Sequence, residues 1–172
     1  VCEIKSGGTP SRNKPEYWNG NIPWVTSTSC KNDFIIEPNE YITELGLNNS
    51  SAKYFEKDST LIALVGATIG KTGFLTFKST TNQNIAGIYP KNCNNLFPKF
   101  LFFISQTLYN EFLKLGEGKF RMANLGFIKK LQIPVPSLDI QKQIVLRIET
   151  EQKAISANKE LIKIFEKKIN DK

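Results

Sequence analysis

The most constraining feature of this sequence is a long C-terminal stretch without any residue that breaks a helix. From Leu138 to Asn170 there is neither glycine nor proline, the two residue types least compatible with a helix interior. Ser137 precedes the stretch and is a suitable N-cap. We therefore expect one continuous helix of about 33 residues, roughly 50 Å long at ~1.5 Å per residue.

An apolar stripe runs along this helix in alternating steps of four and three residues. The average step of about 3.5 residues is typical of a coiled-coil seam, and Glu151 and Asn158 continue the register with polar side chains that would specify the pairing. The rest of the chain is too short to bury such a stripe, so we expect a partner helix; the alternative is an amphipathic helix lying back on its own body. The predicted seam residues are Ile144, Ile148, Ile155, Ile162, Phe165 and Ile169.

The sequence before this helix predicts a β-rich body. Short runs of β-branched and aromatic residues, bounded by Gly, Pro, Asn and Ser, predict strands at residues 22–25, 33–36, 52–55, 60–65, 72–77 and 85–89. A helical pattern over residues 97–115, a short helix over 124–128 and a strand over 131–135 follow. We therefore predict an α+β fold with a body at residues 1–136 and a long coiled-coil helix at 137–172.

The net charge of +7 is concentrated in the middle of the chain. Residues 59–136 contain 9 Lys and Arg against 2 Asp and Glu, whereas the flanking segments are close to neutral. A concentrated basic block attracts polyanions such as nucleic acid. A lysine-rich surface that only maintains solubility is the simpler alternative.

The cysteine and histidine content limits the chemistry that this chain can perform. Cys2, Cys30 and Cys93 are widely spaced and there is no histidine, which argues against a disulfide framework, a zinc site and the usual general base. No apolar run approaches the ~20 residues of a membrane span, and no signal-peptide pattern is present. We expect a cytoplasmic protein with no metal, no cofactor and no catalytic residues.

One segment resembles a nucleotide-binding loop but lacks the required spacing. Residues 66–72 have three residues between Gly66 and Gly70, where a P-loop needs four, and they lead into a predicted strand instead of a helix. A tight turn between two strands fits better, with Gly66, Gly70 and Gly73 in unusual backbone conformations. Lys71 would then lie at the tip and face solvent or a phosphate.

Three loops are dense in side chains that donate and accept hydrogen bonds, at residues 6–12, 26–29 and 80–84. Such side chains can contact base edges and phosphates, although Ser, Thr and Asn also simply favour turns. Together with the basic block, they favour nucleic-acid binding. The predicted DNA-binding residues are Arg12, Tyr17, Trp18, Thr26, Ser27, Thr28, Lys71, Thr81, Asn82, Gln83, Asn84, Lys119 and Arg121.

Several segments resemble the specificity subunits of type I restriction–modification systems, in the same order and spacing. They are residues 7–11 with 17–24, 66–73 with 82–85, and the proline-rich exit 133–144. The resemblance implies a target-recognition domain that reads one half of a bipartite site on double-stranded DNA, and a helix that pairs antiparallel with an equivalent helix as a spacer. It also implies separate methyltransferase and endonuclease/translocase subunits.

The resemblance leaves the organisation of the whole protein open. The sequence starts at Val1 in the middle of a pattern, so we expect either a fragment of a longer subunit or a natural half that forms a homodimer. One alternative is the recognition domain of a single-chain restriction–methyltransferase enzyme. Another is a coiled-coil scaffold protein, which would show no salt-dependent affinity for DNA.

Overall fold

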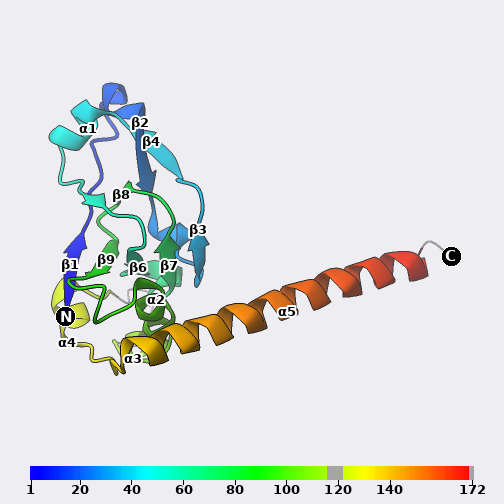
Figure 1. Ribbon diagram of the computed structural model, residues 1–172. Helices are drawn as coiled ribbons and strands as arrows, with labels where there is room; N and C mark the ends of the chain where they lie inside the picture. The colour runs from blue at the N-terminus through cyan, green and yellow to red at the C-terminus, as the bar shows by residue number, and fades with distance from the viewer. Residues whose placement is uncertain (116–121, 171–172) are drawn as a thin grey trace.

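The computed structural model describes residues 1–115 and 122–170 and has an α+β fold, as predicted (Figure 1). One sheet contains five strands in the order β1-β9-β6-β7-β3. Neighbouring strands are antiparallel except β3 and β7, which are parallel. The strands are β1 (Cys2–Ser6), β3 (Asp33–Ile35), β6 (Thr60–Ala63), β7 (Thr72–Leu75) and β9 (Ile85–Pro90).

The second sheet has four strands in the order β4-β2-β8-β5. The strands β2 and β8 are parallel, with Trp24 opposite Thr80 and Val25 opposite Thr81, so their carboxyl ends meet at the same edge of the sheet. The candidate site lies at this edge. The strands are β2 (Trp18–Val25), β4 (Glu40–Ile42), β5 (Tyr54–Phe55) and β8 (Ser79–Thr81).

Short helices cover the ends of the sheets. The α-helices of the body are α1 (Glu44–Asn48), α2 (Pro98–Gln106), α3 (Tyr109–Leu113) and α4 (Leu125–Lys130), and the 3-10 turns are η1 (Pro15–Tyr17), η2 (Ser27–Ser29) and η3 (Gly66–Thr68). The main apolar core lies between the five-stranded sheet and α2. There, Phe102 of α2 packs against Phe74 of β7, with ring centroids 5.5 Å apart.

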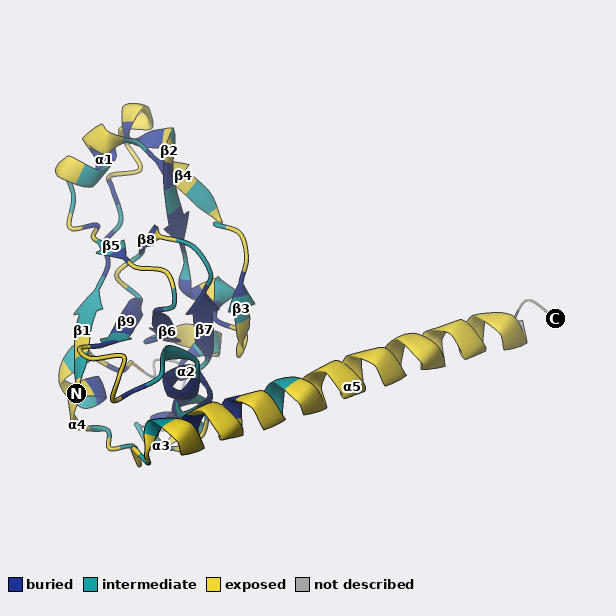
Figure 2. Ribbon diagram, in the orientation of Figure 1, coloured by how far each residue is buried: buried dark blue, intermediate teal, exposed yellow. Residues whose placement is uncertain are grey.

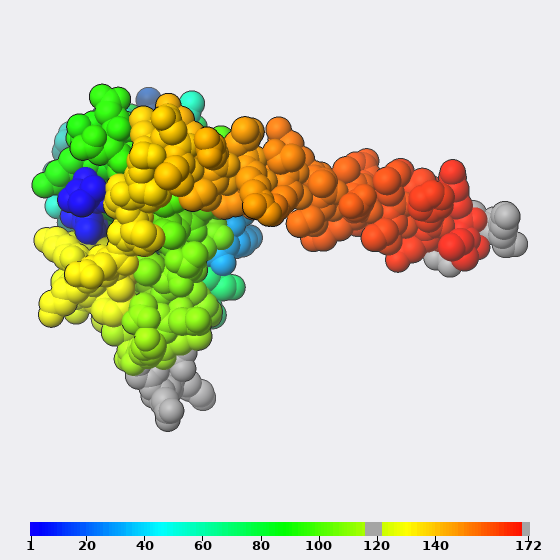
Figure 3. Space-filling model, turned by 60° about the horizontal axis from the view of Figure 1, so that its bottom comes forward, coloured from blue at the N-terminus to red at the C-terminus, as the bar shows by residue number. Residues whose placement is uncertain are grey.

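The long helix α5 (Leu138–Asn170) confirms the prediction from the glycine- and proline-free stretch. Its first turns pack against α2, with Gln141 and Val145 buried. From Thr150 to Ile169 every residue is exposed, and the helix projects away from the body (Figures 2 and 3). The alternative of a helix folded back over the body along its whole length is therefore wrong.

Two sequence predictions of secondary structure are wrong. Residues 131–135 form no strand, because Pro134 and Pro136 lack backbone N–H groups and the segment runs as an irregular connection into α5. The helical pattern at 97–115 divides into α2 and α3, because Thr107 and Leu108 donate to carbonyls three residues back, at 3.1 and 3.2 Å. The strands β1, β4 and β8 and helix α1 were not predicted.

The tight turn predicted at residues 66–72 is confirmed. Strands β6 and β7 are antiparallel neighbours, and η3 lies between them. Gly66 and Gly70 have φ angles of 72° and 75°, in the region that favours glycine. Gly73 does not have a positive φ; it is a strand residue at which an added Cβ would lie 2.4 Å from Ile35 Cδ1.

Candidate nucleic-acid interface

Two of the three loops predicted to bind nucleic acid, at residues 26–29 and 80–84, lie side by side because β2 and β8 are parallel. Asn82 follows β8, and its N–H donates to the carbonyl of Val25, the last residue of β2, at 3.0 Å. Thr26 comes directly after Val25, so the loops at residues 26–29 and 81–84 leave the same sheet edge next to each other. Neither loop's sequence alone indicates this proximity.

A third loop joins them through contacts with β8. Gly8 N–H donates to Thr81 O at 2.8 Å, and Thr9 Oγ1 donates to Gln83 Oε1 at 2.5 Å. This approach requires glycine, because a Cβ on Gly7 would lie 2.1 Å from Thr81 O. The loop after β1 is thereby fixed against the loop after β8.

Asn39 fixes the loop after β2, and the sequence did not identify it. Its side-chain oxygen accepts from Thr26 N and from Ser29 Oγ, both at 2.8 Å. It directly precedes β4, whose first residue Glu40 pairs with Trp24. A lone Asn in a turn carries no distinctive signal, so only strand pairing shows its role. We define the polar edge as Thr9, Thr26, Thr28, Asn39, Asn82 and Gln83.

Four of the predicted DNA-binding residues are buried in the body. Tyr17, Trp18 and Ser27 are each 8% exposed, and Thr81 is 0% exposed. Trp18 packs edge-on against Trp24, with ring centroids 5.1 Å apart, and its indole N–H donates to Ser11 O at 3.1 Å. Tyr17 and Trp18 therefore belong to an apolar cluster of the body with Ile22, Trp24 and Ile42.

Arg12 is held by other side chains of the body. Its two terminal nitrogens donate to the Glu40 carboxylate at 2.6 and 2.7 Å. Its guanidinium lies 3.6 Å from the centroid of the Trp18 ring. The hydrogen bonds from Arg12 lower the pKa of the Glu40 carboxyl. Arg12 would have to leave Glu40 to contact DNA with the same nitrogens.

Two lysines belong to backbone segments that adjoin the loops of the polar edge. Lys71 directly precedes β7 and is partly buried, so the prediction that it lies at the tip of the turn is wrong. Its carbonyl accepts from Ala63 N, and Ala63 pairs with Ile85. Lys31 is exposed between η2 and β3 and was not predicted. Neither takes part in an ion pair among the described residues.

Three predicted DNA-binding residues remain: Asn84, Lys119 and Arg121. Asn84 is partly buried, and its N–H donates to Asn82 Oδ1 at 3.2 Å, which closes a tight local turn. Lys119 and Arg121 lie outside the described residues, so their predicted role stays a prediction.

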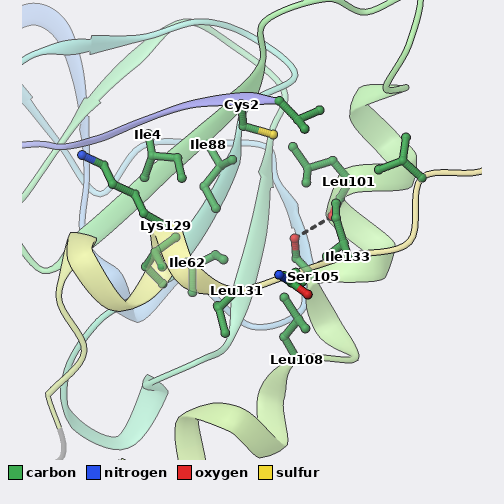
Figure 4. A pocket seen from close by; sticks show the side chains of 14 residues that line it. Cys2, Ile4, Ile62, Ile88, Leu101, Ser105, Leu108, Lys129, Leu131 and Ile133 are labelled. Carbon is green, nitrogen blue, oxygen red and sulfur yellow. Dashed lines mark hydrogen bonds between the residues drawn. The ribbon is translucent and has the colours of Figure 1, made fainter.

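An apolar cavity of about 520 Å³ lies near the N-terminus, between β1, α2 and α4 (Figure 4). Ser105 Oγ in its lining donates to Leu101 O at 2.6 Å, and burial raises the pKa of the Cys2 thiol. Among the described residues, neither Ser105 Oγ nor Cys2 Sγ is hydrogen-bonded to a basic side chain that could activate it as a nucleophile.

The described part of the chain shows neither a metal-binding cluster nor a membrane-spanning helix. Within residues 1–115 and 122–170, no group of three or more His, Cys, Asp and Glu side chains is placed to hold a metal ion. No helix in these same ranges is long and apolar enough to cross a membrane.

The chain therefore consists of a two-sheet body with a continuous polar edge and a long projecting helix. This architecture is typical of a binding domain with an attached helical arm. The chain belongs to the family of the type I restriction modification DNA specificity domain, whose model matches residues 1–166.

Curated proteins with similar sequences are specificity subunits of type I restriction enzymes. The specificity subunit of the type I restriction enzyme MjaIX from Methanocaldococcus jannaschii is 30% identical over 97% of this chain and 39% of the relative. That of the type I restriction enzyme HindI from Haemophilus influenzae is 28% identical over 94% of this chain and 37% of the relative. The chain therefore spans less than two fifths of the length of these relatives.

Solved structures share the fold. The HsdS subunit of Thermoanaerobacter tengcongensis superposes with a TM-score of 0.68 at 20% identity, over 91% of this chain and 36% of that one. The type I restriction–modification S subunit of M. genitalium superposes with a TM-score of 0.64 at 12% identity, over 95% of this chain and 40% of that one.

Proposed function

We propose that this chain is the DNA-reading part of a type I restriction–modification specificity subunit and that it catalyses no reaction itself. The observation that carries the proposal is the polar edge, where three loops from distant parts of the sequence meet beside β2 and β8. The body at residues 1–136 would recognise one half of a bipartite site. The helix at residues 137–172 would act as the spacer.

The chemistry of the polar edge suits a duplex. Asn82 and Gln83 carry amides that can contact adenine, and the Thr28 hydroxyl can contact bases or phosphates. Lys31 and Lys71 would supply phosphate contacts that position the body without reading sequence. Because phosphate contacts release counterions, the affinity should fall steeply as salt rises.

The reactions would be carried out by other chains. Methyl transfer requires a flipped base and a dedicated active site, which we assign to methyltransferase subunits. Cleavage would belong to an endonuclease/translocase subunit. All of these would act on DNA in the cytoplasm, and this chain would need no cofactor.

The seam of α5 supports pairing with an equivalent antiparallel helix, in a second copy or in the other half of a specificity subunit. Its positions are symmetric about the point between Ser156 and Ala157. An antiparallel copy would therefore form layers of 144 with 169, 148 with 165, 151 with 162, and 155 with 158. A parallel pair in register would instead place two Glu151 carboxylates against each other, which is unfavourable.

The base of α5 offers a receiving surface for the tip of such a helix. Ile144 and Ile148 line an apolar groove of about 540 Å³ together with Phe103, Ile104 and Val135. In the antiparallel register, Ile169 and Phe165 of the second copy would lie opposite Ile144 and Ile148. Burying a large apolar side chain contributes about 1.5–3 kcal/mol, so this groove would stabilise the pair.

DNA binding by designed variants tests the proposed function. Mapping the adenines that are methylated in the host genome with and without this chain would identify the cognate site. Fluorescence anisotropy on that duplex should then show that Asn82→Ala combined with Gln83→Ala weakens binding at least tenfold, since a good base contact contributes about 1–3 kcal/mol.

The control is Gln143→Ala, an exposed amide on α5, which should bind like the parent. Equal affinity of the parent for cognate and unrelated duplexes would contradict sequence reading. Absence of any salt-dependent affinity would identify a scaffold protein instead.

A further inference from the structure

A single glutamine anchors the base of the long helix. Gln141 lies in the first turn of α5 and is 0% exposed, whereas its neighbours Ile140 and Lys142 are exposed. A buried amide is costly unless its hydrogen-bonding groups are satisfied. We therefore expect hydrogen-bond partners for both the oxygen and the nitrogen of its amide.

The amide of Gln141 bonds to three separate positions of the chain. Its Oε1 accepts from Phe97 N at 2.8 Å, and its Nε2 donates to Asn95 O at 2.9 Å and to Pro136 O at 2.7 Å. Phe97 is the N-cap of α2, Asn95 belongs to the loop before it, and Pro136 ends the connection to α5. Since these bonds are directional, they fix both the position and the rotation of the first turn.

Apolar packing also restrains the base of the helix, because Ile148 packs against the main core and lines a groove with Ile144 and Phe103. Val145, one turn after Gln141, is 3% exposed, and Glu149 accepts from Lys99 Nζ at 2.5 Å. Both Lys99 and Glu149 are partly exposed, so this ion pair is weak and not directional. Beyond Glu149 the helix makes no buried contact among the described residues.

The free length of α5 amplifies any change at its base. About 20 residues project beyond the docked turns, which is roughly 30 Å at ~1.5 Å per residue. A tilt of ~10° at the base would then move the tip by about 5 Å. This exceeds the ~3.4 Å rise of one base pair along a strand.

We propose that Gln141 is a positioning residue, a hydrogen-bond latch that sets the angle between the body and α5 and thereby the separation at which two recognition bodies contact DNA. The consequence for DNA rests on the proposed function. The latch itself does not depend on it, so the two are tested separately.

The angle is measured by pulsed electron paramagnetic resonance on the full-length protein. One spin label is attached to Cys93, which is exposed, and the other to Lys163→Cys on α5, with Cys2→Ser to remove the partly buried thiol. Labelled chains are diluted with unlabelled ones to suppress distances between copies. The parent should give a single narrow distance distribution.

Gln141→Glu tests the latch because it keeps the shape of the side chain. The carboxylate can still accept from Phe97 N but cannot donate to Asn95 O and Pro136 O. We expect the distance distribution to at least double in width. The matched control Gln143→Glu makes the same change two residues further along the exposed surface and should leave the distribution unchanged.

Far-ultraviolet circular dichroism and a thermal melt of each variant show whether the body has folded. If Gln141→Glu does not fold, Gln141→Met provides the same test with an uncharged side chain of similar length. An unchanged width in a folded variant would overturn the proposal, because the packing of Val145 and Ile148 and the ion pair of Glu149 would then suffice to hold the angle. Unfolding of both variants would also overturn it, since Gln141 would then be needed for folding of the body.

The consequence for DNA is tested with the methyltransferase subunits present. Methylation is measured on duplexes whose two half-sites are separated by spacers that differ by one base pair. Gln141→Glu should reduce the preference for the parent's spacer length at least threefold without changing the affinity of the body for a single half-site. A broadened angle with an unchanged spacer preference would overturn this link, whereas absence of DNA binding by the parent would refute the proposed function and leave the latch standing.

Discussion

Strand β8 consists of three hydroxyl residues that are all completely buried, whereas the distal part of α5 carries apolar residues that are more than half exposed. Ser79, Thr80 and Thr81 each have 0% exposure, while Ile155 is 53% and Phe165 59% exposed. In β8, Ser79 and Thr80 both donate to Pro23 O, at 3.0 and 2.8 Å, so burial leaves these hydroxyls satisfied.

In these two segments, burial follows from available partners more than from polarity. The hydroxyls of β8 find acceptors inside the body and help to place the polar edge. The stripe on α5 has no partner among the described residues, and exposed apolar stripes of this kind mark interaction surfaces.

The largest effect is expected in the seam of α5. Ile155→Asp would bury a carboxylate in the central layer of the pair, so we expect the dissociation constant of the dimer to rise more than 100-fold, about 2.7 kcal/mol or more. Analytical ultracentrifugation measures it. Ser156→Asp, the same new charge on a neighbouring exposed residue, should have little effect. A parent chain that remains a monomer at high concentration would contradict self-pairing.

The register of the pair is tested by cross-linking. In a background with Cys2→Ser and Cys93→Ser, a mixture of Ile148→Cys and Phe165→Cys chains should form a disulfide between different chains under mild oxidation. Chains with Ile148→Cys alone should not, because two antiparallel copies place those residues about 25 Å apart. A disulfide between two Ile148→Cys chains would instead indicate a parallel pair.

A smaller effect is expected in β8. Ser79→Ala combined with Thr80→Val removes both side-chain donors to Pro23 O, and we expect the free energy of unfolding to fall by about 1–3 kcal/mol. Urea denaturation measures it. The matched control, Ser156→Ala combined with Thr150→Val on the exposed part of α5, should change stability by less than about 0.5 kcal/mol. Equal losses would show that burial of the hydroxyls is irrelevant.

The smallest effect concerns the ion pair between Arg12 and Glu40. The folded pKa of Glu40 is lowered, so the pair stabilises the fold above the unfolded pKa of about 4.3 and this contribution is lost as the pH falls through the folded pKa. Because both side chains are largely exposed, the contribution is at most about 1 kcal/mol. Thermal melts from pH 6 to pH 3 should show a steeper loss for the parent than for Glu40→Gln; parallel curves would contradict this.

The sequence predicted the features that depend on local composition. The absence of glycine and proline from Leu138 to Asn170 was sufficient for α5, and two glycines with positive φ were correctly placed in the turn before β7. The short helix predicted over residues 124–128 corresponds to α4, which Asn124 caps by accepting from Phe127 N at 2.9 Å.

The sequence did not predict features that arise from contacts between distant segments. Nothing in Ser79–Thr81 distinguishes a buried strand from a polar loop until Pro23 O is seen to accept from it. The burial of Trp18 similarly depends on its packing against Trp24. Asn39 and Gln141 act through hydrogen bonds to residues far along the chain, so their roles could not be inferred from spacing.

Hydroxyl-radical footprinting on the cognate duplex tests the central claim most directly, because it reports on the body and on the helix together. The parent chain should protect two regions at a constant separation, one for each body held by the paired helices. Ile155→Asp should protect each half-site separately and without a fixed spacing. A parent that protects no specific region, or only one, would contradict the account.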